Sequence, residues 1–276
     1  ESFEKLDAGI MNFINETNFK RFLMIIKSAG FVDSSMIRSQ NALNFAYILY
    51  LKLKEQKSQN IDSIVSRWFV LSMLTGRYSS SPESQFDFDV KKTQNGKFEE
   101  FLHETEKGEL SEAFWNTALI QELDTSVASS PYFNVFLAAQ VKDNDAGFLS
   151  KDITVREMLN LRGDIHHIYP KNYLKKNNYS RGEYNQIGNY VYAQQEINIK
   201  IGDASPETYI KDLINQTTGE KCKYGLISTK QGLEKNFEVN CIPLELLDNP
   251  KLEYEKFLEK RRKLISKKIK EYYFNL

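Results

Sequence analysis

The chain has 276 residues, of which 41% are apolar and 13% aromatic, and its 37 basic side chains balance 37 acidic ones. We expect a folded, soluble protein of two modest domains, or of one domain with a large extension. No apolar run approaches the roughly 20 residues that a membrane helix needs, which argues against a membrane protein. The two cysteines, Cys222 and Cys241, have no C-x-x-C spacing, which argues against a disulfide scaffold and a four-cysteine zinc site.

The start of the chain and its charge distribution suggest how it is organised. It begins at Glu1 without a secretory leader, which is consistent with a fragment of a longer cytoplasmic protein. Residues 1–150 carry 15 basic and 20 acidic side chains, whereas residues 151–276 carry 22 and 17. These opposite signs suggest that only the C-terminal half meets a polyanion, although ordinary scatter of solvated charge explains the difference equally well.

Residues 1–150 predict a helical domain. In the clearest segment, Ile64, Trp68 and Leu71 recur at i, i+4 and i+7, which is one apolar face of an amphipathic helix. The predicted helices of this multihelix bundle cover residues 13–26, 42–53, 61–74, 110–123 and 132–141. In the connection after the third, Arg77 and Tyr78 could hold a phosphate, but a solvated loop is the expected arrangement.

Residues 151–276 predict a small α+β module. Residues 164–169 and 190–192 are rich in apolar and aromatic side chains and predict two short strands. Ser205 followed by Pro206 is typical of a helix start, because serine caps the helix and proline suits its first position. The predicted order is therefore strand, loop, strand and helix.

A long basic helix is expected after Pro250. Residues 250–270 contain 9 basic and 3 acidic side chains. The apolar positions predict a buried stripe on the helical bundle: Tyr254, Leu258, Ile265, Ile269 and Tyr272. Residues 260–263 could then reach DNA, and a merely soluble surface is the competing interpretation.

Two adjacent histidines, His166 and His167, indicate the chemistry. An apolar residue and Pro170 follow them, and Asn189 and Asn198 come later, nine residues apart. Hydrolysis of a phosphodiester needs a water, a base that deprotonates it, and positive charge. Histidine is a natural base near neutral pH, because its ordinary pKa is about 6.5. The order and spacing are those that a one-metal phosphodiesterase site needs.

This arrangement resembles the HNH nucleases of the His-Me finger class. The resemblance implies a ββα-metal fold and metal-assisted hydrolysis of DNA that leaves 5′-phosphate ends. It also implies that His167 is the general base, that Asn189 braces the loop behind it, and that His166 and Asn198 are metal ligands. Asp164 would hydrogen-bond a histidine ring, or would only cap the strand.

The wider context resembles the C-terminal HNH module of GmrSD-type, modification-dependent restriction systems. The similar stretches are residues 184–189, 196–203 and 205–206, with residues 131–150 similar to the helical region that precedes the module. The resemblance implies a role in restriction or phage defence, with double-stranded DNA as substrate. It also implies a partner, an N-terminal ParB-like nucleotide-hydrolysing domain that this chain does not contain.

The site departs from many HNH sites, which have an aspartate where His166 stands. A neutral imidazole and amide suit Mn²⁺, Ni²⁺ or Zn²⁺ better than the hard ion Mg²⁺. We therefore expect a divalent cofactor, Mn²⁺ or Mg²⁺, with Ni²⁺ or Zn²⁺ as alternatives. Neighbours in a regular strand point to opposite faces, so His166 and His167 can flank one ion only if the backbone bends near Pro170. Otherwise one histidine is a core residue and the other is exposed.

The sequence thus predicts a metal-dependent DNA endonuclease. Candidate contacts to DNA phosphates are basic residues near the histidines, although solvated side chains are equally expected at each: Lys171, Lys175, Lys176, Arg181 and Lys200. The third histidine, His103, is expected to be structural. Two alternatives are a non-catalytic nucleic-acid-binding or scaffold subunit that keeps the fold, and an RNA-directed nuclease.

Overall fold

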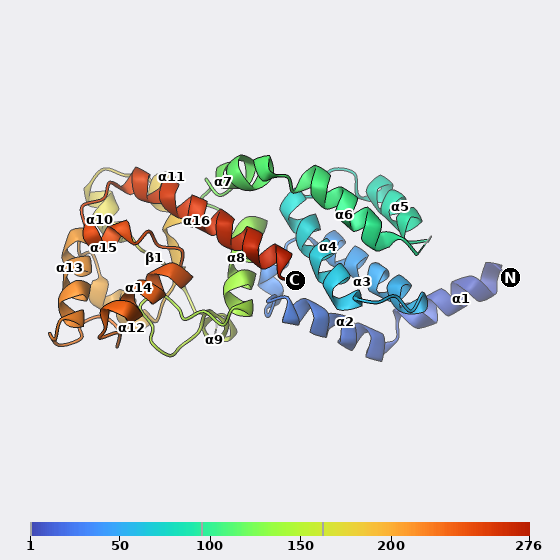
Figure 1. Ribbon diagram of the computed structural model, residues 1–276, viewed down its shortest axis with the longest axis horizontal. Coiled ribbons are helices and arrows are strands. Elements are labelled where there is room, and N and C mark those ends of the chain that lie inside the picture. The colour runs from blue at the N-terminus through green and yellow to red at the C-terminus, as the bar shows by residue number, and fades with distance from the viewer. Residues whose placement is uncertain (1, 95, 162) are drawn as a thin grey trace.

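The computed structural model describes residues 2–94, 96–161 and 163–276, and the chain is mainly helical (Figure 1). The N-terminal elements are α1 (Ser2–Phe13), α2 (Glu16–Ser28), η1 (Ser34–Met36), α3 (Gln40–Glu55), α4 (Ile61–Thr75), α5 (Pro82–Thr93), α6 (Phe98–Glu109), the π-helical turn η2 (Phe114–Ala118), α7 (Leu119–Glu122) and α8 (Pro131–Lys142). They are followed by α9 (Val155–Asn160), β1 (Ile165–His167), α10 (Lys171–Lys176), α11 (Arg181–Tyr184), η3 (Ile187–Asn189), β2 (Tyr190–Tyr192), α12 (Gln195–Ile201), α13 (Pro206–Thr217), α14 (Lys230–Val239), α15 (Glu245–Asp248) and α16 (Tyr254–Phe274). The expected mainly helical chain with a small α+β module and a long C-terminal helix is confirmed at this level.

The N-terminal helices form the bundle that their apolar spacing predicts. The face of α4 that carries Ile64, Trp68 and Leu71 is buried, and α4 lies against α2, α3, α6 and α8. The helix ends where Gly76 adopts a left-handed conformation with φ of 62°, which glycine reaches without a steric penalty. The helix predicted over residues 110–123 is found over residues 112–122, with the π-helical turn η2 in its middle and α7 as its last turn.

In the connection after α4, Arg77 is half-buried and Tyr78 is buried, whereas Gly76 and residues 79–81 are exposed. The expected solvated loop is therefore wrong at Arg77 and Tyr78. The Arg77 guanidinium donates from Nε and Nη2 to Asp89, at 2.8 and 2.7 Å, and from Nη1 to Glu109 at 2.6 Å. It also lies 4.8 Å from the centre of the Trp68 ring. Tyr78 donates to Asp89 at 2.8 Å and accepts from Trp68 at 3.0 Å. This charged network holds the loop on the bundle and leaves Arg77 engaged rather than free for a phosphate.

The C-terminal part has a hydrophobic cluster of its own around Tyr209, Phe237 and Phe257. Helix α13 begins as predicted, because Ser205 Oγ accepts from the Thr208 N–H at 3.1 Å and Pro206 takes the first helical position. The cluster lies beside the only sheet of the described residues, in which β1 pairs antiparallel with β2. Helix α12 follows β2, so two strands and a helix succeed one another as expected.

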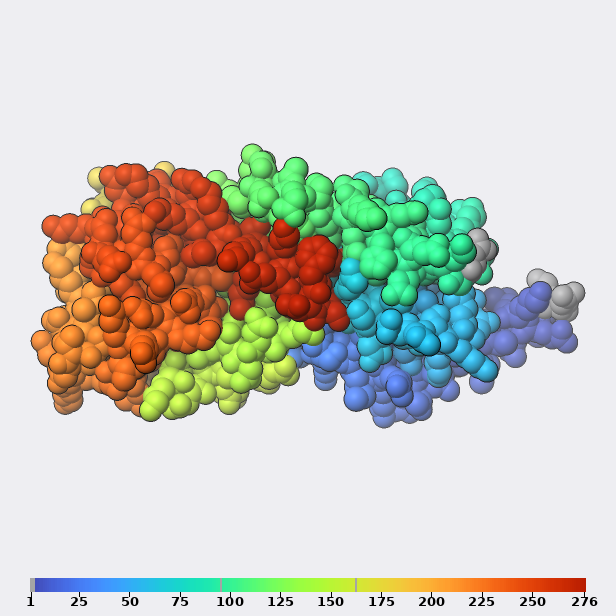
Figure 2. All heavy atoms as spheres, viewed as in Figure 1, coloured from blue at the N-terminus to red at the C-terminus, as the bar shows by residue number. Residues whose placement is uncertain are grey.

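Helix α16 connects the two hydrophobic clusters. Its first turns contribute Tyr254, Phe257 and Leu258 to the C-terminal cluster, and its last turns contribute Ile265 and Ile269 to the bundle. The predicted buried stripe is therefore confirmed. In Figure 2 this helix runs across the surface from the C-terminal part to the bundle.

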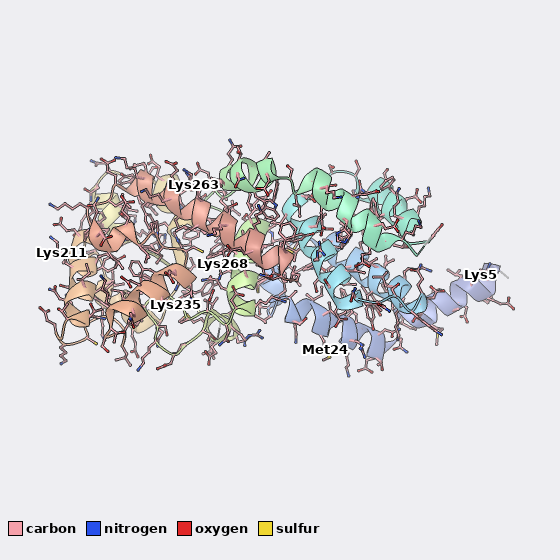
Figure 3. The ribbon with its side chains drawn as sticks, viewed as in Figure 1. Lys5, Met24, Lys211, Lys235, Lys263 and Lys268 are labelled. Atoms are coloured by element: carbon pink, nitrogen blue, oxygen red, sulfur yellow. The ribbon has the colours of Figure 1, made fainter. Side chains whose placement is uncertain are left out.

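The basic face of α16 differs from the expectation that residues 260–263 reach DNA. Arg261 is fully buried and donates to the carbonyl oxygens of Gly188, at 2.9 Å, and Asn240, at 3.1 Å. Burial lowers the pKa of its guanidinium to about 10. Arg262 pairs with Asp124 at 2.7 Å, and Lys263, labelled in Figure 3, pairs with Glu259. Arg261 and Arg262 are therefore engaged within the fold, whereas Lys260 and Lys263 are exposed and form surface ion pairs with Glu245 and Glu259.

Helix α1 projects from the end of the bundle (Figure 1) and leaves its apolar side chains in solvent. Phe3 is 78% exposed and Leu6 is 61% exposed. Among the described helices, none combines the length and apolar character needed to cross a bilayer.

The buried network predicts a specific loss of stability. Asp89→Asn should lower the free energy of unfolding by about 3–5 kcal/mol, because it leaves the buried Arg77 with one carboxylate instead of two. The matched variant Asp87→Asn breaks an exposed i,i+4 pair with Lys91 and should have little effect. Urea unfolding of both variants measures the difference, and equal stabilities would contradict a structural role for the network.

Candidate active site

The two histidines lie in the short antiparallel ladder. His166 is opposite Val191 and His167 is opposite Tyr190. Because side chains alternate along a paired strand, the two rings leave opposite faces. The chain bends only after His167, at Ile168 and Tyr169. The bend that would turn both rings toward one ion is therefore not found, and a site in which both histidines bind the same ion from one side is not supported.

His167 is half-buried and is held through one ring nitrogen. Its Nε2 lies 3.0 Å from Asn185 Oδ1, and its ring meets the Tyr190 ring edge to face at 5.3 Å. Burial lowers the pKa of His167, the hydrogen bond that the ring makes to Asn185 opposes this shift, and the charge of Lys171 adds to it. The ring is thus neutral at neutral pH. With Nε2–H donating to Asn185, the lone pair of Nδ1 is left to accept a proton.

Asn185 was not among the predicted site residues. It lies eighteen positions after His167, and its side chain reaches the ring from the turn between α11 and η3. The sequence offered one signal, an asparagine four residues before Asn189, but nothing in its spacing distinguishes it from a solvated turn residue.

Asn189 is fully buried and joins the end of β1 to the start of β2. Its Oδ1 accepts from the Tyr169 N–H at 2.8 Å. Its Nδ2 donates to the carbonyl oxygens of Tyr169 at 3.0 Å and Tyr184 at 3.2 Å. The backbone carbonyl of Asn189 also accepts from the Ile168 N–H at 2.9 Å. The residue therefore fixes the loop that directly follows His167.

The two predicted metal ligands, His166 and Asn198, are half-buried. Neither side chain makes a hydrogen bond within the described part of the chain, so both keep their donor atoms available. Burial lowers the pKa of His166, and the charge of Asp164 opposes this shift. Asp164 itself is exposed and makes no hydrogen bond to either ring in the described chain. A neutral imidazole and a free amide oxygen are suitable donors for a divalent transition-metal ion. No cluster of three or more histidine, cysteine or acidic side chains suited to a metal occurs in the described residues.

The predicted DNA contacts fall into two groups. The ammonium groups of Lys171 and Lys175 both lie 5.7 Å from the centre of the Tyr184 ring, next to Asn185. Lys176 instead pairs with Asp203, which occupies its charge. Arg181 and Lys200 are exposed and take part in no ion pair within the described ranges. Of these cations, Lys171 is the one whose charge acts on His167, and Lys175 lies beside the same Tyr184 ring.

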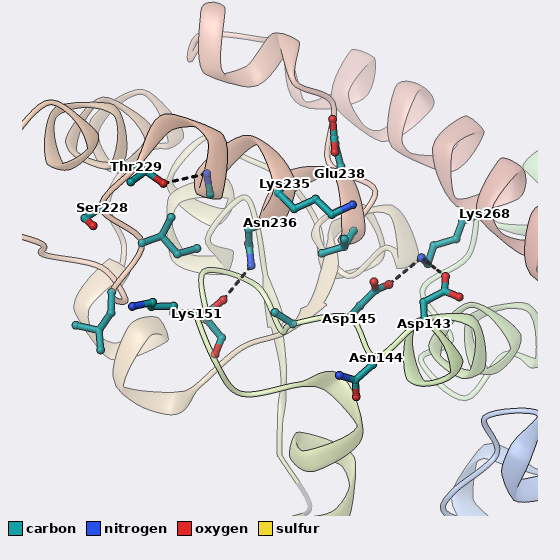
Figure 4. A pocket seen from close by; sticks show the side chains of 16 residues that line it. Asp143, Asn144, Asp145, Lys151, Ser228, Thr229, Lys235, Asn236, Glu238 and Lys268 are labelled. Carbon is teal, nitrogen blue, oxygen red and sulfur yellow. Dashed lines mark hydrogen bonds and ion pairs between the residues drawn. The ribbon is translucent and has the colours of Figure 1, made fainter.

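A cavity of about 760 Å³ lies elsewhere, between residues 143–150 and α14 (Figure 4). Its wall includes Lys268, which bridges Asp143 at 2.8 Å and Asp145 at 2.7 Å. None of the predicted site residues lines this cavity. His103, the third histidine, lies on α6 with Nδ1 3.2 Å from Glu106, consistent with the structural role expected of it.

Comparison with known proteins gives little further information. No family model matches the chain, and no solved structure gives a significant match. The uncharacterized protein MJ0686 of Methanocaldococcus jannaschii is 27% identical over 223 residues, which cover 75% of this chain and 37% of that protein. The chain thus spans little more than a third of the relative's length. The name of that relative assigns no activity.

We call the hydrogen bonds from the Asn189 side chain to the backbone of Tyr169 and Tyr184 the Asn189 clamp. The clamp predicts a loss of stability when this side chain is removed. Asn189→Ala should lower the free energy of unfolding by about 2–4 kcal/mol, because it removes the side chain that pairs the buried N–H and carbonyl oxygen of Tyr169. Asn198→Ala is the matched control, since that asparagine is half-buried and makes no side-chain hydrogen bond within the described chain. Urea unfolding of the two variants provides the measurement, and a loss below about 0.5 kcal/mol for Asn189→Ala would contradict the clamp.

Proposed function

We propose that this chain is a metal-dependent DNA endonuclease module of the HNH, or His-Me finger, kind that hydrolyses phosphodiester bonds. The observation that carries the proposal is the arrangement around His167. A neutral, partly enclosed imidazole stands at the end of a strand, Asn185 fixes one ring nitrogen, and the buried Asn189 clamps the loop that follows. A general base needs a ring that is fixed through one nitrogen and free at the other, and this arrangement meets that requirement.

The opposite orientation of the two histidines limits where the phosphate could lie. In an in-line displacement the attacking water and the leaving oxygen lie on opposite sides of one phosphorus atom. Because β1 separates the faces that carry His166 and His167, the phosphate would have to lie at the end of the strand, where both side chains could approach it. There His167 Nδ1 would take the proton of the water. His166 and Asn198 would hold a divalent ion, which would supply positive charge to the pentavalent phosphorus and the departing 3′ oxygen.

The substrate and the biological setting complete the proposal. Lys171 and Lys175 would hold backbone phosphates beside His167, since both are exposed and free of ion pairs in the described chain. The module would be the cleavage part of a modification-dependent restriction or phage-defence system and would act in the cytoplasm. Its partner would be a ParB-like nucleotide-hydrolysing domain, and the greater length of the relative supports a larger whole protein.

Loss of the base should abolish cleavage without unfolding the chain. His167→Ala should slow the nicking of plasmid DNA by roughly 100-fold or more. His103→Ala is the control, because that ring lies on α6, away from the two histidines of β1, and hydrogen-bonds Glu106. Cleavage of duplex DNA and of RNA is followed for both variants by gel electrophoresis. Undiminished cleavage by His167→Ala would exclude this mechanism, cleavage of RNA alone would favour the RNA-directed nuclease, and DNA binding without any cleavage would favour the non-catalytic subunit.

The choice of metal ion that supports cleavage should follow from the ligand atoms that the protein supplies. With an imidazole and an amide as protein ligands, cleavage should be faster with Mn²⁺ than with Mg²⁺ and should stop in EDTA. Asn198→Ala should raise the Mn²⁺ concentration needed for half-maximal rate by about 10-fold, whereas Asn172→Ala, on the exposed face of α10, should not. Full activity in EDTA would contradict the metal site.

The rate should also depend on pH through His167. Its pKa is lowered below the ordinary value of about 6.5, so the neutral base is formed at lower pH, and the rate should rise with pH and level off before pH 6.5. The stability that the neutral ring contributes is fully present above about pH 6.5 and is lost as pH falls through the folded pKa. Asn185→Leu removes a hydrogen bond that raises this pKa and should lower it further, as an NMR titration of the ring would show. A pKa above 6.5 would contradict the enclosed, neutral base.

A further inference from the structure

Helix α1 presents an apolar face that is exposed to solvent. Its last turn is anchored on the bundle, because the Phe13 ring lies 5.1 Å from the Tyr47 ring and the Phe13 carbonyl accepts from the Tyr47 hydroxyl at 2.8 Å. The apolar face continues onto α2, where the Phe19 ring is 45% exposed and lies 5.5 Å from the same Tyr47 ring. The large apolar side chains exposed along α1 and directly after it are Phe3, Leu6, Ile10, Met11, Phe13 and Ile14.

The spacing along α1 is that of a helix-pairing stripe. Four of the exposed side chains follow one another at intervals of three, four and three residues: Phe3, Leu6, Ile10 and Phe13. We call these four the α1 stripe. Two helices bury such a stripe against each other when they pack side by side. The charged side chains Glu4, Lys5 and Asp7 fall outside it. A membrane surface attracts helices with an excess of basic side chains, whereas α1 carries two acidic and one basic, so a helix is the better partner.

The exposed apolar area suits a second copy of the chain. Side chains of this size present about 150–250 Å² when fully accessible, so the six that are about half exposed or more present on the order of 600 Å² per copy. This area is at the upper end of the apolar patches that monomers leave uncovered. Two copies that cover each other's face bury on the order of 1,200 Å², the lower limit of a specific interface. A two-fold axis brings the same stripe onto itself, so the second copy supplies the missing helix.

We propose that two copies of this chain associate through α1, with the two helices antiparallel across a two-fold axis. Leu6 then packs beside the partner's Ile10, and Phe3 packs beside the partner's Phe13. The bundle is attached to one end of α1 (Figure 1), so an antiparallel pair places the two bundles at opposite ends, whereas a parallel pair would crowd them at the same end. Antiparallel helix dipoles also attract each other. The dimer is independent of the nuclease proposal, since it uses neither histidine and needs no metal.

Sedimentation equilibrium of the full chain in EDTA tests the dimer. The mass should rise with concentration from monomer to dimer, with a dissociation constant of about 1–100 µM for an interface of this size. Ile10→Glu should raise that constant at least about 10-fold, because the interface would remove its carboxylate from water. Ala8→Glu is the matched control, since it places the same carboxylate on the exposed side of α1 outside the stripe. A chain that stays monomeric at about 200 µM, or equal dimerisation by Ile10→Glu and the wild type, would overturn the proposal.

Mixtures of charged variants test the orientation of the two helices. Antiparallel packing places position 6 beside position 10 of the partner, so Leu6→Lys mixed with Ile10→Glu gains an ion pair. Leu6→Lys mixed with Leu6→Glu gains one only in a parallel pair. The first mixture should therefore form heterodimers at least about 5-fold more tightly than the second. Leu6 is 61% exposed and Ile10 is 50% exposed, so the bundle does not depend on either side chain, and thermal melting confirms that each variant is folded. Tighter association of the second mixture would overturn the antiparallel dimer.

Discussion

A single buried amide, the side chain of Asn189, joins the chain just after β1 to the chain just before β2. Its hydrogen bonds satisfy backbone groups of Tyr169 and Tyr184 that no strand or helix pairs. A sheet of two three-residue strands is too small to fix its own loops, because an isolated hairpin is at best marginally stable. The position of His167 therefore depends on this amide more than on the ladder in which the histidine lies.

The clamp is itself supported from the helical part of the chain. Arg261 of α16 donates to the carbonyl of Gly188, the residue before Asn189. From the other side, the carbonyl oxygens of Thr125 and Ser126 accept from the Ile187 N–H and the Tyr190 hydroxyl. A fully buried guanidinium that donates only to neutral carbonyl oxygens is costly to desolvate. Its planar group holds the donor atoms in fixed positions, so it holds the two carbonyl groups in place. The bundle thus helps to position the candidate base rather than merely tethering the module.

Apolar periodicity correctly predicted the helices that bury one continuous apolar face. The face of α4, the start of α13 and the buried stripe of α16 follow directly from apolar spacing and capping residues. Charged positions were predicted less well. A sequence shows that Arg77 and Arg261 are cationic. It does not show that Asp89 binds Arg77, or that two backbone carbonyl oxygens accept from Arg261, inside the fold. For the same reason the spacing selected His167 and Asn189, while Asn185, which reaches the ring only through the fold of the intervening loop, was missed.

The segment from Trp115 to Ser126 contacts both the C-terminal helix and the loop around Asn189. At one end its π-helical turn forms a wall of a cavity under α16, and at the other its backbone carbonyls hold η3 and Tyr190. The Tyr190 ring packs on His167. The surroundings of the candidate base are therefore set by contacts on both sides of the residue 150 boundary, and the module is incomplete without the helices that precede it.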